Sequence, residues 1–339
     1  MKIAILDDYQ DAVRGLDCFK LVAGHEVKVF NNSARGLGQL AIRLAPFDAL
    51  VLIRERTAFN RALLARLPNL KLISQTGKVA GHIDVAAASE LGIAIAEGVG
   101  SPTAPAELTW ALIMAAQRKI LPYAQHLQEG LWQTASIEPA RNTLGSVLKG
   151  RTLAIWGYGK IGQLIAGYGR AFGMQILVWG SEASRAAAVA AGDTAAATRE
   201  EFFETADVLS LHLRLAPATR GLVTAEDLAR MKPGALFVNT SRAELVAEGA
   251  LEAALQLGRP GAAALDVFTE EPLPPTSPLL KLPNVLATPH LGYVEQDSYE
   301  LYFRYALQNI VDFAQGNCTR LLNPEVLAHA RQRGDTQDR

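Results

Sequence analysis

Cysteine is almost absent from this chain of 339 residues, which contains only Cys18 and Cys318. Two cysteines exclude a disulfide-stapled scaffold and a cysteine-rich metal centre, so we expect no metal site and a reducing compartment. The chain also lacks a run of about 18 apolar residues that could span a bilayer. Its first apolar run is too short for a secretory signal peptide. These absences predict a cytoplasmic protein that does not bind a membrane.

An excess of charge of either sign is missing as well. The 33 lysines and arginines balance 34 aspartates and glutamates, which leaves a formal net charge of -1. Without a basic surplus we expect no nucleic-acid partner. A hydrophobic content of 49% and a charged content of 20% are typical of a globular protein. The length predicts about two domains.

The chain does contain a regular alternation of short apolar runs with helical patterns, in two series. This alternation predicts parallel sheets covered by helices on both faces. The fold class we expect is therefore α/β, with two doubly wound parallel-sheet domains. The predicted strands of the first series are residues 2–6, 26–30, 49–53, 71–74 and 93–96. Those of the second series are residues 152–156, 174–179, 208–211, 236–239, 262–266 and 285–287.

A glycine-rich turn follows the first strand of the second series. Gly157, Gly159 and Gly162 form the pattern G-x-G-x-x-G between an apolar run and a helical pattern that begins near Lys160. Such a turn lets a pyrophosphate approach the backbone and places it at the positive end of a helix. The pattern therefore predicts a dinucleotide site, although an ordinary glycine-rich turn between strand and helix would read the same.

Two long helical patterns lie outside the second series of strands. The first begins at Thr103 and has an apolar face wide enough for either a core helix or a contact with a partner subunit. The second, residues 299–314, follows the last strand, and we expect it to return to the first domain. We therefore assign residues 1–101 and 293–339 to one discontinuous domain, which ends in a polar tail from residue 329, and residues 102–292 to the other.

Polar residues follow three of the strands after the glycine turn. They include Arg242, Asp266, Glu271 and His290. Ligands of open α/β sheets bind at the carboxyl ends of strands. Hydride transfer to a 2-keto acid needs a proton donor that works near neutral pH, a partner for it, and a cation for the carboxylate. His, Glu and Arg supply this set.

The chain resembles the D-isomer-specific 2-hydroxyacid dehydrogenases, over residues 50–316. The resemblance rests on Gly-Tyr-Gly-Lys-Ile-Gly, on the Asn-Thr-Ser-Arg segment that ends at Arg242, on Leu-Asp-Val-Phe with Glu271-Pro, and on Thr-Pro-His290. It implies a Rossmann dinucleotide-binding domain inserted into a flavodoxin-like substrate domain, NAD or NADP as cofactor with a slight preference for NAD, and a homodimer.

The resemblance also implies roles for individual residues. Arg242, Glu271 and His290 are the expected catalytic residues, with Arg242 holding the substrate carboxylate and His290, paired with Glu271, giving its proton to the carbonyl oxygen. The residues expected to bind substrate are Arg54, Gly77, Lys78, Val79 and Arg242. Those expected to bind the cofactor are Gly157, Tyr158, Gly159, Lys160, Ile161, Gly162, Gly180, Ser181, Glu182, His212, Thr219, Thr240, Ser241, Asp266, His290 and Gly292.

Two positions depart from the family pattern. The substrate loop carries Lys78 and Val79 where the family commonly has a second glycine, and Lys78 either favours dianionic substrates or is a solvated loop lysine. Gly180 stands at the end of the second Rossmann strand, where members that prefer NAD have an acid that binds the ribose hydroxyl. Ser181 could contact a 2′-phosphate there, whereas Glu182 would oppose it, so the cofactor preference stays open.

The expected function is therefore an NAD(P)-dependent oxidoreductase that interconverts a 2-keto acid and the (R)-2-hydroxy acid. Two alternatives stay open. One is an NAD(H)-sensing binding protein of the corepressor type. The other is a dehydrogenase of a small anion such as phosphite, which uses the same three residue types.

Overall fold

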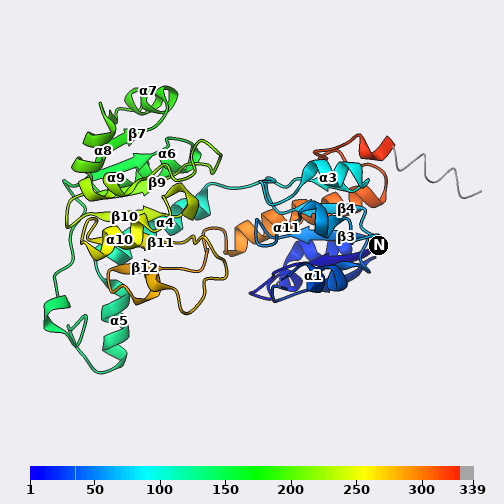
Figure 1. The fold of residues 1–339 in the computed structure, drawn as a ribbon, viewed down its shortest axis with the longest axis horizontal. Helices are drawn as coiled ribbons and strands as arrows, with labels where there is room; N and C mark the ends of the chain where they lie inside the picture. Colours follow the sequence, from blue (N-terminus) through cyan, green and yellow to red (C-terminus); the bar gives the residue numbers. More distant parts are fainter. Residues whose placement is uncertain (35, 329–339) are drawn as a thin grey trace, which may run out of the picture. The chain divides into compact units, whose positions relative to one another are not determined.

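A computed structural model describes residues 1–34 and 36–328 of the chain (Figure 1). The chain divides into two compact units. The first unit comprises Met1–Ser101 and Glu295–Arg339, and the second comprises Pro102–Val294. The tail expected from residue 329 lies outside the described residues.

The first unit contains a five-stranded parallel sheet in the order β2-β1-β3-β4-β5. Apolar side chains of these strands alternate between its two faces, as a sheet with two covered faces requires. Leu50, Leu52 and Ile73, for example, belong to one apolar cluster with residues of α1, α2 and α3. The strands are β1 (Lys2–Ile5), β2 (Glu26–Val29), β3 (Ala49–Leu52), β4 (Leu72–Gln75) and β5 (Ala94–Ala96).

Helices cover both faces of this sheet. The cluster above holds α1 (Leu37–Leu44), α2 (Arg61–Leu64) and α3 (Val85–Glu90). The helix α11 (Gln296–Ala314) packs against β3, β4 and the short 3-10 helix η2 (Asp17–Val22), and η1 (Val13–Gly15) precedes η2. The buried hydroxyl of Ser74 on β4 donates to the carbonyl of Ala306 on α11 (2.8 Å). The C-terminal helix therefore completes the first unit.

The second unit contains a seven-stranded parallel sheet in the order β12-β11-β10-β9-β6-β7-β8. Read from β8, this order is that of a Rossmann domain with one added strand, and the chain reverses direction across the sheet next to β6. The strands are β6 (Thr152–Trp156), β7 (Gln175–Trp179), β8 (Thr194–Ala195), β9 (Val208–Leu211), β10 (Leu236–Asn239), β11 (Ala262–Leu265) and β12 (Val285–Ala287).

Two apolar clusters fill the two faces of this sheet. One joins the sheet to α4 and α6, and the other joins it to α8, α9 and α10. The wide apolar face of α4 packs against α6, β10 and β11 of this unit. The helices are α4 (Thr103–Gln117), α5 (Ile120–Gln128), α6 (Lys160–Ala171), α7 (Glu182–Ala190), α8 (Arg199–Thr205), α9 (Ala225–Arg230) and α10 (Ala250–Gln256). The 3-10 helices are η3 (Pro139–Arg141), η4 (Ala243–Leu245) and η5 (Pro278–Lys281).

The fold class expected from the sequence is confirmed, and each strand expected from the sequence is present. Capping residues mark where two helices begin, and one of them, α11, begins before the expected residue 299. Ser181 accepts a hydrogen bond from the amide of Ser184, so α7 begins at Glu182, and Glu295 accepts from the amides of Asp297 and Ser298, so α11 begins at Gln296. The helix α5 and the short edge strand β8 were not expected from the sequence.

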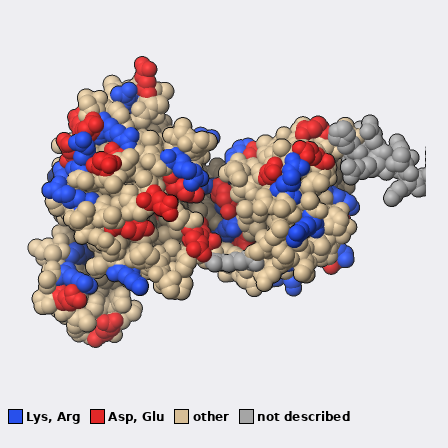
Figure 2. Space-filling model, viewed as in Figure 1, with Lys and Arg blue, Asp and Glu red and all other residues tan. Residues whose placement is uncertain are grey.

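The described part of the chain contains no helix long and apolar enough to cross a membrane. Among the same residues, no group of three or more His, Cys, Asp or Glu side chains could hold a metal ion. Both cysteines are free. Figure 2 shows positive and negative side chains interspersed on the visible face of each unit.

Candidate active site at the carboxyl edge of the second sheet

The three glycines of the turn after β6 meet three different steric requirements. Gly157 has φ of 101°, and a Cβ there would lie 2.5 Å from the carbonyl oxygen of His212. A Cβ on Gly162 would overlap the carbonyl oxygen of Gly157. A Cβ on Gly159 would meet nothing within 4 Å. Gly157 and Gly162 are therefore required by packing, whereas the open space at Gly159 fits a ligand that approaches the backbone.

The start of α6 offers donors for an anion. Gly159 is its N-cap residue and provides no side-chain cap for Lys160, Ile161 and the following amides. Tyr158, between the first two glycines, is buried, and its hydroxyl donates to Asp193 (2.5 Å). Burial raises the pKa of the Tyr158 hydroxyl, so it stays protonated. The Tyr158–Asp193 bond thus anchors the glycine turn. The first amides of α6 have no side-chain cap, so they can bind an anion.

The end of β7 has no acidic residue at Gly180, which has φ of 145°. The hydroxyl of Ser181 caps α7, and Glu182 lies in the first turn of that helix. The Arg185 guanidinium lies over the ring of Trp179, 5.1 Å from its centre. The end of β7 is therefore followed by the carboxylate of Glu182, the guanidinium of Arg185 and the hydroxyls of Ser181 and Ser184. These groups do not determine whether the site prefers NAD or NADP.

His212 and Thr219 lie in the segment after β9, and both side chains bond within the protein. The Nε2 atom of His212 is 2.9 Å from the hydroxyl of Ser210, and burial lowers the pKa of His212 to about 4. The imidazole is therefore neutral near pH 7. The Thr219 hydroxyl donates to the carbonyl of Arg214 and accepts from the amide of Ala216.

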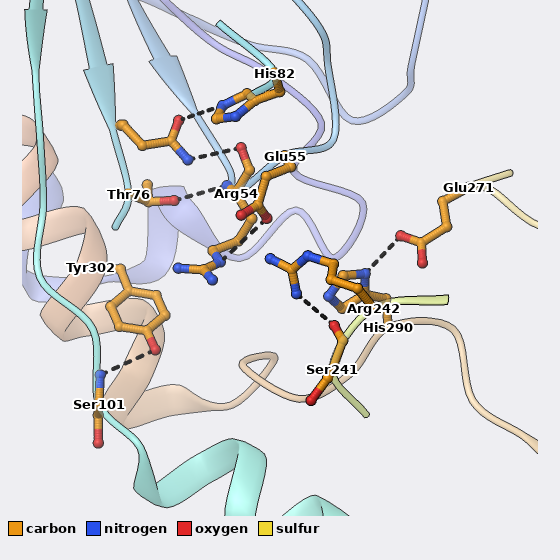
Figure 3. Close-up of polar contacts among 11 residues, drawn as sticks. Arg54, Glu55, Thr76, His82, Ser101, Ser241, Arg242, Glu271, His290 and Tyr302 are labelled. Carbon is orange, nitrogen blue, oxygen red and sulfur yellow. Dashed lines mark hydrogen bonds and ion pairs between the residues drawn. The ribbon is translucent and has the colours of Figure 1, made fainter. Parts of the chain in front are cut away.

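Arg242 follows β10 and is held by its neighbours in the chain. Asn239, the last residue of β10, donates its side-chain amide to the carbonyl of Arg242 (2.9 Å) and accepts from the amide of Ser241 (3.0 Å). The Ser241 hydroxyl donates to the carbonyl of Leu211 on the adjacent strand (2.7 Å). The Thr240 hydroxyl lies 2.7 Å from that of Thr109 on α4. These bonds fix the loop, and the guanidinium reaches back to the carbonyl of Ser241 (2.6 Å; Figure 3).

Glu271 and His290 form the central pair of the site. The Nδ1 atom of His290 lies 2.7 Å from Oε2 of Glu271, as Figure 3 shows. The other carboxylate oxygen, Oε1, accepts from the amide of Phe268 (2.9 Å), which fixes the carboxylate. The side chain of His290 is 23% exposed and that of Glu271 is 32% exposed. The imidazole is therefore oriented by a carboxylate and still open to a ligand. The pairing expected from the sequence is therefore present.

The backbone at His290 is in the left-handed region, with φ of 54°. The fully buried carboxylate of Asp266 holds the loop in this form. It accepts from the Thr288 hydroxyl (2.7 Å), the Leu291 amide (2.7 Å) and the Gly292 amide (2.9 Å). Burial raises the pKa of Asp266, and these donors oppose that effect. Asp266, expected to bind the cofactor, therefore holds the loop on both sides of His290.

The segments that carry these residues lie at one edge of one sheet. β10, β11 and β12 are adjacent and parallel, so their carboxyl ends coincide. The loops after them carry Arg242, Glu271 and His290, and the glycine turn follows β6 in the same sheet. The arrangement can orient an imidazole and present a guanidinium at the same end of the sheet as the glycine turn.

In the first unit, the residues expected to bind substrate follow β3 and β4. Arg54 has φ of 53°, its amide donates to the Thr76 hydroxyl (3.1 Å), and its carbonyl accepts from Gln75 (2.9 Å). A Cβ on Gly77 would overlap the Arg54 guanidinium, so Gly77 leaves room for that side chain. Figure 3 shows Arg54 with Glu55 and Thr76. A strained backbone just after the carboxyl end of a strand, as at Arg54, is typical of a functional position.

Lys78 and Val79 are both bound to Glu97, which follows β5. The Lys78 ammonium lies 2.6 Å from Oε2 of Glu97, and the Val79 amide donates to Oε1 (2.7 Å). Sequence reasoning missed Glu97, Asn239 and Thr109 as residues that position the expected sites. Their only signal was a polar residue at the end of a strand or on a helix face, which many structural residues share.

A family model for the "D-isomer specific 2-hydroxyacid dehydrogenase, NAD binding domain" matches residues 110–292, within the second unit. A glyoxylate reductase of Aeropyrum pernix is 38% identical over 268 residues, which are 78% of this chain and 80% of that protein. A D-3-phosphoglycerate dehydrogenase of Methanocaldococcus jannaschii is 37% identical over 255 residues, 75% of this chain. The chain spans only 47% of that protein's length.

Solved structures include a phosphoglycerate oxidoreductase of Vibrio cholerae O395 with a TM-score of 0.90 and 59% sequence identity, matched over 93% of this chain and 99% of that one. The similarity therefore covers both units and not only the dinucleotide-binding part. Together with the family model and the relatives, it places the chain in the D-isomer specific 2-hydroxyacid dehydrogenase family.

Proposed function

We propose that this chain reduces a 2-keto acid to the (R)-2-hydroxy acid with a nicotinamide cofactor. As a member of its family, the chain is an oxidoreductase of 2-hydroxy acids with an NAD-binding domain. The observation that carries the finer proposal is the 2.7 Å contact between Nδ1 of His290 and Glu271, in loops at the same sheet edge as Arg242.

Each residue of this set has one role in the proposed reaction. The Arg242 guanidinium binds the substrate carboxylate through paired hydrogen bonds. The protonated imidazole of His290 donates from Nε2 to the carbonyl oxygen as negative charge develops there. Glu271 lies 2.7 Å from Nδ1 and so fixes the orientation of the imidazole, with Nε2 toward the substrate. When bound, the nicotinamide supplies the hydride that goes to the carbonyl carbon.

We propose different parts for several of the cofactor residues expected from the sequence. The open space at Gly159 and the uncapped start of α6 fit a pyrophosphate. Asp266, Ser241 and Thr219 already bond within the protein, so we propose that they shape the pocket for the cofactor by holding their loops. His290 and Gly292 lie on the loop that Asp266 holds.

We propose that the enzyme uses NAD and tolerates NADP, because Gly180 leaves the ribose position without a carboxylate that would repel a 2′-phosphate. Ser181 and Arg185 lie at the same corner, with Glu182 as an opposing charge. A kcat/KM with NADPH below about a hundredth of that with NADH, a difference of about 2.7 kcal/mol, would contradict this tolerance.

We propose that residues of the first unit, Arg54 and the loop Gly77–Lys78–Val79, contribute to substrate binding. The left-handed backbone of Arg54 and the place of the loop after β4 support this. Because the Val79 amide donates to Glu97, its part is to hold the loop and not to bind the ligand directly.

The test is a panel of glyoxylate, hydroxypyruvate, pyruvate, phenylpyruvate and 2-ketoglutarate with NADH and NADPH, followed by the loss of absorbance of the reduced cofactor. We expect turnover with at least one of the smaller keto acids. Tight NADH binding with only weak turnover on all of them would favour a dinucleotide-sensing protein. Oxidation of phosphite without turnover of keto acids would favour the small-anion alternative. The relatives' names favour neither alternative.

We also propose that the enzyme is a homodimer that buries the segment from α5 to β6. In the lower left of Figure 1 this segment extends away from the sheet of the second unit. It carries large apolar side chains with high exposure, including Leu144 at 90% and Trp132 at 74%. The other exposed large apolar residues of this segment are Ile120, Leu121, Leu127, Ile137 and Val147. A patch of this kind is typical of a subunit interface. Sedimentation near the mass of one chain at micromolar concentration would contradict the dimer.

A further inference from the structure

We propose that Glu97 determines the charge class of the substrate, by neutralising Lys78 so that the enzyme prefers a 2-keto acid with no second anionic group. This inference rests on the proposed function and on the proposed contact of the loop Gly77–Lys78–Val79 with substrate. It names the substrate class, which neither the family nor the relatives decide.

The Glu97 carboxylate is fixed more firmly than its partner. Its side chain is 14% exposed, whereas that of Lys78 is 73% exposed. The backbone of Glu97 is bonded on both sides, because its amide donates to the carbonyl of Arg320 (3.1 Å) and its carbonyl accepts from Asn309 (3.1 Å), which is fully buried. A fixed, largely buried carboxylate thus lies 2.6 Å from an exposed ammonium.

Glu97 also binds the loop itself. Its second oxygen accepts from the Val79 amide (2.7 Å), and the amide of Gly98 donates to the carbonyl of Gly77 (2.9 Å). The segment after β5 therefore holds the loop after β4 at both of its ends. A change of Glu97 that keeps an acceptor oxygen should leave this loop in place while it removes the negative charge.

The other cations at this edge of the first sheet also have partners. The Nε atom of Arg54 is 3.9 Å from the carboxylate of Glu55. The Arg56 guanidinium donates to the carbonyl of Asp7 (2.5 Å) and lies 4.5 Å from the ring centre of Tyr9. Arg54 is thus near a carboxylate, and Arg56 is engaged by a carbonyl and a ring, so a second carboxylate or a phosphate on the substrate would compete with these partners and would meet the negative charge of Glu97.

The test compares hydroxypyruvate with its phosphate ester, which differ only in the second anionic group. The wild-type kcat/KM should be higher for hydroxypyruvate. Glu97→Gln keeps an acceptor for the Val79 amide and leaves the Lys78 charge uncompensated. The ratio of kcat/KM for the ester to that for hydroxypyruvate should therefore rise about tenfold, as expected for charges several ångströms apart near a protein surface.

Glu90→Gln is the matched control. Glu90 forms an equally short ion pair with Arg61 (2.6 Å) in the same unit, but it lies on α3 and not in the loop. It removes the same charge, so the ratio should stay at the wild-type value. If Glu97→Gln does not fold, Lys78→Met serves instead, since it leaves Glu97 uncompensated and should lower the ratio about tenfold.

Several results would overturn the inference. They are a wild-type preference for the ester, or an unchanged ratio in Glu97→Gln or, in its place, Lys78→Met. An equal change in Glu90→Gln would also overturn it, because the effect would then be one of net charge. The proposed function fails separately, if the wild type reduces no 2-keto acid at all.

Discussion

The carboxyl edges of the two sheets differ in how their polar residues are held. In the second unit, the loops are held by Asp266 and Asn239, and their charged or titratable groups are Arg242 and the pair formed by His290 and Glu271, whose side chains are partly exposed. In the first unit, the charged groups are paired with one another, as Lys78 is with Glu97. The first arrangement suits chemistry, which needs a few oriented groups. The second suits selection among substrates, which depends on the charge that remains.

The largest expected effect of a single substitution is at His290. His290→Asn keeps a side chain of similar polarity but removes the proton donor, so we expect kcat to fall at least about a hundredfold. Cofactor binding should be kept, since the glycine turn is not altered. Steady-state kinetics and titration of NADH fluorescence measure the two effects.

The outcome that would contradict this role is a kcat within about fivefold of the wild type. A matched change in the first unit is Lys78→Met, which removes a positive charge and leaves the proposed catalytic proton donor, His290, in place. It should change the preference among substrates and leave kcat for a monoanionic keto acid within about threefold of the wild type.

A second comparison lies within the glycine turn, between Gly162 and Gly159. Gly162→Ala places a Cβ against the carbonyl oxygen of Gly157, so we expect a loss of about 1–3 kcal/mol in the free energy of unfolding of the second unit. Gly159→Ala meets open space in the protein. It should fold normally and raise the KM for NADH, because the new methyl group occupies the space proposed for the pyrophosphate.

Denaturant unfolding and the KM for NADH separate these two effects. Equal stability of the two variants would contradict the packing role of Gly162. An unchanged KM in Gly159→Ala would contradict the place proposed for the pyrophosphate.

The smallest effect concerns pH and His212. Burial lowers the pKa of this imidazole from 6.5 to about 4, so the unfolded chain binds its proton at a higher pH than the folded one. The stabilising contribution is therefore fully present above about pH 6.5 and is lost as the pH falls toward about 4. Because the side chain keeps some solvent contact, we expect about 1–2 kcal/mol.

The measurement is the free energy of unfolding at pH 7 and at pH 4.5, for the wild type and for His212→Gln, which can still bond to Ser210. The wild type should lose more stability than the variant between these pH values. Equal losses would show that His212 is not buried in its neutral form.

The sequence predicted the strands and the two units, because these depend on local pattern and on the topology of parallel sheets. The pairing of Glu271 with His290 was expected from the resemblance to the family, and the contact is present. The sequence could not predict the capping by Ser181 and Glu295, which depends on side-chain geometry within one turn. It also could not predict that Lys78 is bound to Glu97, because the partners lie on different strands and only the fold brings them together.

We propose that the carboxyl ends of the strands of the second sheet hold the site that reduces a 2-keto acid to a 2-hydroxy acid of D configuration. The most direct measurement is the chirality of the product of hydroxypyruvate or phenylpyruvate reduction, determined by chiral chromatography. We expect the (R)-2-hydroxy acid as essentially the only product, and we expect its formation to be lost in His290→Asn. A product that is (S) or racemic, or a reaction that proceeds unchanged without His290, would contradict this proposal.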